Sequence, residues 1–146
     1  MPTAPKLVAG LLLAALAFVV TEMVKAGLPS SITVGAVSEV NALIAFFGGW
    51  KFIGARVGKG TSAAITNGIT GTFATTVVCL FVHAVEQMVA DSMDRKYRTV
   101  FEAIDGAITY FLEYGSFLLT LNILGLMAIG AIIVAVAAEV ASHYWR

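Results

Sequence analysis

His83 and Glu86 are the residues whose types and spacing best suit chemistry. They lie three positions apart in "FVHAVEQMV" (81–89), directly after the uncharged run "TGTFATTVVCL". On a helix this spacing places both side chains on one face, where an imidazole and a carboxylate could bind a divalent cation or relay protons. Two residues do not make a metal motif, so we favour the interpretation that both simply reach the hydrated headgroup zone of a membrane.

If the pair forms a site, the carboxylates of Glu22 and Glu39 are its expected partners. Both acids lie at the ends of apolar segments that should reach the same side of a membrane as His83. A cation held by these four residues is therefore the alternative hypothesis. The favoured interpretation includes no metal and no other cofactor.

A basic cluster, formed by Lys51, Arg56 and Lys59, surrounds the glycine-rich stretch "GARVGKGTS" (54–62). Its simplest role is to anchor the chain by contact with anionic lipid headgroups. The alternative is contact with an oxyanion, because the glycines at 54, 58 and 60 expose backbone N–H groups. The stretch lacks the G-x-x-x-x-G-K-[ST] spacing of a phosphate loop, which argues against nucleotide binding.

Several other chemistries are disfavoured by the residue inventory. Cys79 is the single cysteine, so the chain has no internal disulfide and no cysteine metal cluster. There is no H-E-x-x-H or CxxC motif and no plausible Ser-His-Asp order, and we expect no enzyme. Nine Lys and Arg balance nine Asp and Glu, which gives no indication of nucleic-acid binding.

The elements that must position these residues are predicted to be membrane helices. Hydrophobic residues make up 59% of the chain and charged residues 12%, with a mean hydropathy of +0.90, whereas a soluble domain is about one-quarter charged. A span needs about 20 apolar residues. We therefore predict an all-α membrane protein, a single domain over residues 1–146, with four spans. The predicted spans are 7–24, 34–54, 63–89 and 123–140, the first of them an uncleaved helix.

The long connection between the third and fourth spans is predicted to contain an amphipathic helix over 98–121. Glu102, Asp105 and Glu113 recur at helical spacing on one side, and apolar residues such as Ile104 and Ile108 fill the other. Helices that lie on a membrane usually have basic polar faces. Because this polar face is acidic, we expect the apolar face to dock on the protein's own helices.

The distribution of charge predicts the orientation. With four spans, the side that carries both termini has five Lys and Arg residues and the other side has four. The positive-inside rule then places the termini in the cytoplasm. All but one of the acids fall on the opposite side. We therefore expect a multi-pass protein of a bacterial cytoplasmic membrane.

Small residues recur at helical spacing in three of the spans and predict seams where helix backbones approach closely. These seams pack either within the chain or against another membrane protein. Their members are Ala45 and Gly49 in the second span, Ala64, Gly68 and Gly71 in the third, and Ala128, Ala131 and Ala135 in the fourth.

Five stretches together resemble the TrgA family of small integral membrane proteins, which are associated with tellurite resistance in alphaproteobacteria. They are "VNALIAFFGGWKFIGARVGKG" (40–60), "AAITNGITG" (63–71), "HAVEQM" (83–88), "EYG" (113–115) and the terminal "HYWR". Thr66 and His143 depart from the family's pattern. The resemblance covers nearly the whole chain and implies a stress-response role in tolerance to tellurium oxyanions. It supplies neither a mechanism nor site residues.

Two functions are therefore expected from the sequence. The first is a non-enzymatic membrane protein that lowers tellurite toxicity by affecting transport or the redox state of the membrane. The alternative is an accessory subunit packed, through its small-residue faces, against a larger respiratory or photosynthetic membrane complex.

Overall fold

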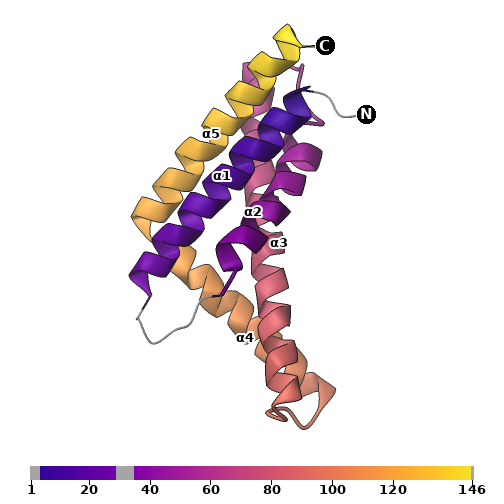
Figure 1. Ribbon diagram of the computed structural model, residues 1–146, viewed down its shortest axis with the longest axis vertical. Helices are drawn as coiled ribbons and strands as arrows, with labels where there is room; N and C mark the ends of the chain where they lie inside the picture. Colours follow the sequence, from indigo (N-terminus) through magenta and orange to yellow (C-terminus); the bar gives the residue numbers. More distant parts are fainter. Residues whose placement is uncertain (1–3, 29–34, 146) are drawn as a thin grey trace.

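The computed structural model describes residues 4–28 and 35–145, and every regular element within these ranges is a helix (Figure 1). Val34, the first residue of the predicted second span, lies outside the described residues. The helices are α1 (Ala4–Gly27), α2 (Val37–Gly48), the π-helix η1 (Gly49–Ile53), α3 (Thr61–Met93), α4 (Val100–Leu118) and α5 (Leu121–Tyr144).

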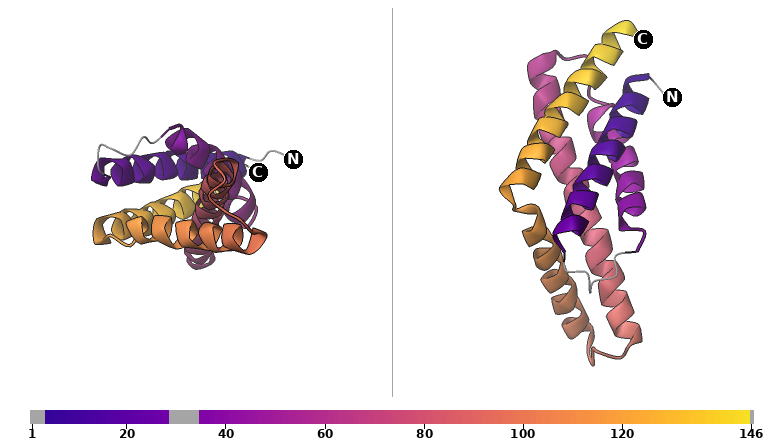
Figure 2. Two further views of the ribbon diagram at one scale, coloured as in Figure 1. Left: turned by 90° about the horizontal axis from the view of Figure 1, so that it is seen from below. Right: turned by 60° about the vertical axis from the view of Figure 1, so that its left-hand side comes forward.

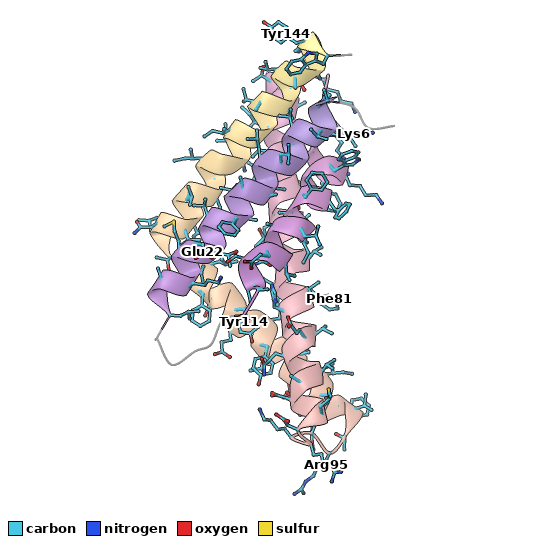
Figure 3. All side chains as sticks on the ribbon, viewed as in Figure 1. Lys6, Glu22, Phe81, Arg95, Tyr114 and Tyr144 are labelled. Carbon is cyan, nitrogen blue, oxygen red and sulfur yellow. The ribbon has the colours of Figure 1, made fainter. Side chains whose placement is uncertain are left out.

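The helices form an elongated up-and-down bundle. α1 runs away from the end that holds both termini, α2 and η1 return to it, α3 runs away again, and α4 and α5 bring the chain back (Figures 1 and 2). Lys6 and Tyr144 lie near one end of the long axis and Arg95 lies at the other (Figure 3). The hairpin of α3 and α4 extends beyond α1 and α2 at the Arg95 end (Figure 1).

Three helices are long and apolar enough to cross a membrane, namely α1, α3 and α5. They contain the predicted spans 7–24, 63–89 and 123–140, so these three predictions are confirmed as candidate spans. The remaining prediction, the second span at 34–54, is not among these three helices. Its helix covers only 37–53, it carries Glu39, Asn41 and Lys51, and it changes from α to π geometry at Gly49.

Small residues let the helices approach closely at the centre of the bundle. Gly49 lies against the backbone of Ala9, and a Cβ atom on Gly68 would lie 2.7 Å from the Ala131 carbonyl oxygen. Nearly all of the predicted seam residues are buried inside this chain: Ala45, Gly49, Ala64, Gly68, Gly71, Ala131 and Ala135. Ala128 is exposed, so it does not pack within this chain, and the predicted contact of Ala128 with another membrane protein stays a prediction.

The amphipathic helix is present as α4 and begins with a side-chain cap. The Thr99 hydroxyl accepts a hydrogen bond from the Glu102 N–H at 3.2 Å, and the Glu102 carboxylate accepts one from the Arg98 N–H at 2.7 Å. This resembles a capping box, in which a threonine and an acid three residues later satisfy the first N–H groups of a helix. α4 is shorter at both ends than the predicted 98–121.

The predicted docking face of α4 was wrong. Its apolar residues are exposed, including Phe101 at 84% and Ile108 at 54%. Two glycines of α4 lie close to other parts of the chain instead. Gly106 lies against the ring of Tyr97, in the turn that follows α3, and Gly115 lies near Leu80 of α3. The periodicity identified the apolar and acidic faces of α4 but not these two contacts.

Asp91, near the end of α3, is hydrogen-bonded both to the turn that follows α3 and to α4. Its side chain is 3% exposed and accepts hydrogen bonds from Lys96 Nζ at 2.5 Å and Tyr97 Oη at 3.3 Å. The Tyr110 hydroxyl of α4 and Gln87 Nε2 also donate to it. Because a buried carboxylate must be paired, these four donors hold the hairpin in one geometry.

Raising the pH above about 10 is expected to loosen this hairpin. The hydrogen bond to Asp91 raises the pKa of Lys96 and the pKa of Tyr110, and burial raises the pKa of Tyr97. The folded chain therefore binds these protons more tightly than the unfolded chain. The stability that these three protonated groups give to the hairpin is complete below their ordinary pKa values. It is lost as the pH rises through their pKa values in the folded chain.

The measurement is a spectrophotometric titration of tyrosinate, combined with the distance between spin labels at Val89 and Ile104. We expect tyrosinate to form above the usual pH range and the label distance to widen with it. Replacing Tyr110 with Phe should reduce the pH dependence. A label distance that stays constant through the alkaline range would contradict the assignment.

Candidate functional site

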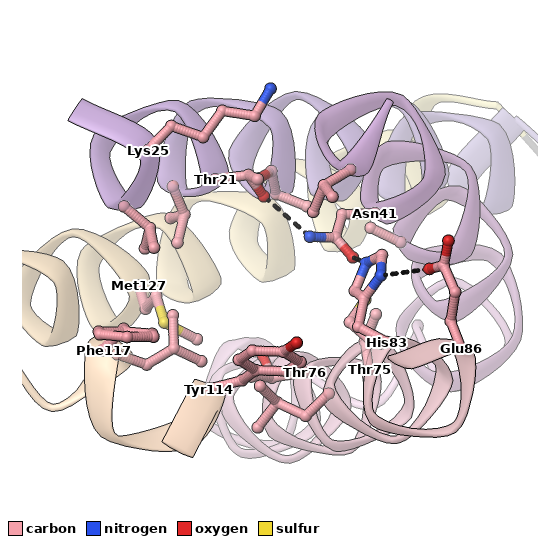
Figure 4. Close-up of a pocket in the computed structure, with 18 of the residues that line it drawn as sticks. Thr21, Lys25, Asn41, Thr75, Thr76, His83, Glu86, Tyr114, Phe117 and Met127 are labelled. Carbon is pink, nitrogen blue, oxygen red and sulfur yellow. Dashed lines mark hydrogen bonds and ion pairs between the residues drawn. The ribbon is translucent and has the colours of Figure 1, made fainter. Parts of the chain in front are cut away.

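A chain of hydrogen bonds joins three helices around His83 (Figure 4). His83 of α3 contacts the Asn41 Oδ1 atom of α2 through Nε2 at 2.9 Å and the Glu86 carboxylate through Nδ1 at 3.1 Å. Asn41 in turn donates from Nδ2 to the Thr21 hydroxyl of α1 at 3.1 Å, and Thr21 donates to the Ala17 carbonyl at 2.7 Å. The network therefore fixes the relative positions of α1, α2 and α3.

The direction of the hydrogen bond between Asn41 and His83 follows from the Thr21 hydroxyl. Since the Thr21 hydroxyl donates to Ala17, it must accept from the Asn41 amide, which turns Oδ1 of Asn41 toward His83. His83 Nε2 must then carry the hydrogen of that contact. The Nδ1 atom of the same ring lies 3.1 Å from the Glu86 carboxyl group.

Glu22 and Glu39, the predicted partners, do not join this network. The Glu22 carboxylate accepts hydrogen bonds from the Ser38 hydroxyl at 2.5 Å and from Lys25 Nζ at 3.0 Å, while Glu39 is exposed. In the described parts of the chain, no group of three His, Cys, Asp or Glu side chains is placed to hold a metal ion. Asn41 and Thr21 occupy the positions expected for the carboxylates.

The two members of the pair differ in their surroundings. The Glu86 side chain is 72% exposed, whereas the His83 side chain is only 13% exposed. His83 bridges α2 and α3, so a substitution there acts on helix packing.

The network lies beside a cavity of about 530 Å³ to which all five α-helices contribute (Figure 4). Such a volume is in the range of small-molecule sites. Tyr114 and Phe117 of α4 and Met127 of α5 lie across the cavity from Thr21 and Lys25 (Figure 4). The lining combines apolar residues with polar ones. The apolar residues include Leu13, Leu16, Val20, Phe117 and Met127, and the polar ones include Thr21, Asn41, Thr72, Thr76, His83 and Tyr114.

The basic cluster lies at the other end of the molecule, and Lys51, Arg56 and Lys59 are all exposed there. The glycine N–H groups that were candidates for an oxyanion contact are occupied by the protein itself. Buried Glu139 of α5 accepts hydrogen bonds from the Gly58 N–H at 2.7 Å and from the Gly60 N–H at 2.9 Å. These N–H groups therefore fasten the loop to α5.

Sequence reasoning missed the cavity, although a signal for it was present. Thr72, Thr76, Cys79 and His83 follow one another at intervals of four, three and four residues, which places them on one face of α3. All four line the cavity. A polar stripe inside a predicted span is the pattern that indicates such a site.

Over residues 4–28 and 35–145 the regular structure is thus entirely helical, with three candidate membrane-spanning helices and a mixed apolar and polar cavity between the helices. A comparison with protein-family models found no match, and comparisons with curated proteins and with solved structures found none either.

Proposed function

We propose that the chain crosses the membrane four times, with α2 and η1 forming the additional crossing. The support is their antiparallel alignment with α1. Glu22 bonds Ser38 near one end of this helix pair, and Gly54 lies against Lys6 at the other. At 1.5 Å per residue, the stretch of α1 between these contacts measures about 24 Å, which is most of the roughly 30 Å hydrocarbon layer.

The proposed orientation places both termini on the cytoplasmic side of a bacterial inner membrane. The balance of Lys and Arg supports this orientation. The position of both ends of the chain at one end of the bundle supports an even number of crossings (Figure 1). α3 is longer than a span requires. Its last turns and α4 therefore lie outside the membrane, and the cavity lies in its outer half.

The proposed function is a non-enzymatic contribution to tellurite tolerance, exerted by binding a small molecule in the cavity. The observation that supports this function is the cavity. All five α-helices line it, and its wall includes the hydrogen-bond network of Thr21, Asn41, His83 and Glu86. The resemblance to TrgA suggests tellurite as the stress. Hydroxyl, amide and imidazole groups set in apolar walls are suited to recognition of a ligand dissolved in the membrane.

Replacing Ala17 with Phe is expected to abolish tolerance. Ala17 lines the cavity, and a phenyl ring there would occupy much of it. The matched control is Ala15→Phe on the same helix, because Ala15 is exposed and does not line the cavity. In a deletion strain, Ala17→Phe should survive tellurite no better than the empty vector, whereas Ala15→Phe should restore tolerance, both at equal membrane levels.

The second candidate function, an accessory subunit, is favoured by the exposed apolar face of α4. Phe101, Ile104, Ile108 and Leu112 all lie on the hairpin that extends beyond α1 and α2. Replacing Ile104 and Ile108 with Ser tests it. Loss of tolerance in this variant, with Ala17→Phe remaining tolerant, would overturn the cavity proposal and support a docked partner.

A further inference from the structure

A shallow groove runs between α2, η1 and α3 on the outside of the bundle, with a volume of about 320 Å³. Gly48 and Thr75 lie at its base, where both are buried and where a Cβ atom on Gly48 would collide with the Thr75 side chain. Phe47 of α2 and Val78 of α3 also line the groove, and they are 60% and 42% exposed. The groove therefore opens away from the core, toward the lipid that surrounds a membrane bundle.

Lys51 is the one charged residue that lines this groove. The other lining residues are apolar apart from Thr75, whose hydroxyl already donates to the Gly71 carbonyl at 2.7 Å. Lys51 is exposed, and none of the ion pairs between described residues involves its ammonium group. The groove thus combines apolar walls with a single cation that has no acidic partner in the described part of the chain.

Lys51 belongs to η1, toward the end of the bundle that holds both termini (Figure 1). Three residues later, Gly54 lies against Lys6 of α1. With α2 and η1 crossing the membrane as proposed above, Lys51 lies about one turn inside the level of Lys6, and a lysine side chain is long enough to carry its charge out to the headgroups. Ile44 and Phe47 line the groove at greater depth. The groove therefore has its cation toward the headgroups and its apolar walls toward the acyl chains.

The charges near this end of the groove favour an anion. Arg56 and Lys59 are exposed in the loop that follows η1. Glu139, the acid beside this loop, is buried, and its two carboxylate oxygens accept hydrogen bonds from N–H groups of the loop itself. Its carboxylate is thus already bonded and does not pair with the exposed cations.

We propose that this groove binds one anionic phospholipid, with an acyl chain along the apolar walls and the phosphate against Lys51. The inference goes beyond the cavity function and rests on the proposed crossing by α2 and η1. Basic pockets between membrane helices on the cytoplasmic side are suited to lipid phosphates, and π-helical turns such as η1 are frequent at functional sites. A soluble anion is disfavoured, because a single cation lines the groove and its walls are apolar.

Quenching of tryptophan fluorescence by brominated lipids measures which lipid occupies the groove. The reporter is Phe47→Trp, with the two natural tryptophans, Trp50 and Trp145, replaced by Phe. The protein is reconstituted in phosphatidylcholine vesicles that contain increasing fractions of dibrominated phosphatidylglycerol or of dibrominated phosphatidylcholine. We expect half-maximal quenching at an about fivefold lower fraction of the brominated phosphatidylglycerol, the preference expected from one lysine near anionic headgroups.

Phe73→Trp in the same background is the matched control for the surrounding lipid. Phe73 is 69% exposed on α3 and does not line the groove. It lies within one helical turn of Thr75, so its depth in the membrane is similar. Both brominated lipids should quench this reporter to nearly the same extent.

Lys51→Gln tests the headgroup contact. Combined with the Phe47→Trp reporter, it should abolish the preference for phosphatidylglycerol, while the unfolding temperature stays the same because Lys51 is exposed. Lys59→Gln is its matched control, because it removes a cation from the same end that does not line the groove, and the preference should remain. Excess inorganic phosphate should not displace the lipid.

Equal quenching of the Phe47→Trp reporter by the two brominated lipids would overturn the proposal and leave the crossing intact, whereas quenching by neither lipid would overturn the crossing as well. A preference that Phe73→Trp shows equally, or that Lys59→Gln removes as fully as Lys51→Gln, would reveal diffuse attraction to the basic end of the bundle in place of a site. Displacement by inorganic phosphate would assign the contact to a soluble anion. Each of these results would refute the bound phospholipid.

Discussion

Glu139→Ala is expected to destabilise the folded protein by about 3 to 6 kcal/mol, since each of its two hydrogen bonds to the charged carboxylate contributes about 1.5 to 3 kcal/mol. The Glu139 carboxyl group accepts from the N–H groups of Gly58 and Gly60. Both glycines have positive φ angles, of 86° and 93°, a conformation that most residues avoid. Without the carboxylate, the loop between η1 and α3 loses the contact that holds it in this form.

Thermal unfolding of the detergent-solubilised protein measures the loss, and limited trypsin digestion locates it. Arg56 and Lys59 lie in the same loop and are exposed, so an opened loop should be cleaved faster at these two residues. The control is His143→Ala. The His143 side chain is 63% exposed and lies 3.6 Å from buried Glu139, and because water screens the exposed imidazole we expect this contact to contribute less than about 1 kcal/mol. Equal effects of the two substitutions would refute the role given to Glu139.

Gly68→Val is expected to prevent α3 and α5 from packing, at a cost of about 3 kcal/mol or more, because overpacking against backbone cannot relax by side-chain rotation. A Cβ atom at Gly68 would lie 2.5 Å from the Ala135 Cβ and 2.7 Å from the Ala131 carbonyl oxygen. Both neighbours belong to α5 and are themselves buried. The two helices would have to separate along their whole contact.

The yield of folded protein and its unfolding temperature should both fall in this variant. Gly125→Val is the matched control on α5, since no described atom lies within 4 Å of the position a Cβ would take there. That substitution should change stability by less than about 1 kcal/mol, the usual range for surface positions. A Gly68→Val protein as stable as this control would show that the seam between α3 and α5 is not close-packed.

Hydropathy predicted α1, α3 and α5 because each presents an uninterrupted apolar run that only a helix can carry through a membrane. It was less informative for residues 37–53, where the polar groups that shorten the apolar run are the ones that bind other helices. Asn41 was an interruption in the sequence and is the centre of the hydrogen-bond network in the fold. Composition alone could not tell whether a polar residue such as Asn41 ends an apolar segment or forms hydrogen bonds between helices.

The candidate site was predicted in part. His83 and Glu86 do contact each other, as helical spacing requires. Their neighbours depend on how three helices meet, and Asn41 is 42 residues away from His83. The same limit applies to Glu139, whose glycine partners are 79 and 81 residues distant in the chain. One sequence holds no signal for contacts at that range.

The π-helix η1 has a consequence for how this chain can change during evolution. The Gly54 N–H bonds the Gly49 carbonyl oxygen at 2.8 Å, one residue further along than an α-helical hydrogen bond. The turn therefore contains one residue more than the α-helix needs. A deletion of one residue within 49–53 would restore a regular α-helix without shifting the contacts on either side. A one-residue gap at this place in a homologous sequence would thus mark the same bundle rather than a different one.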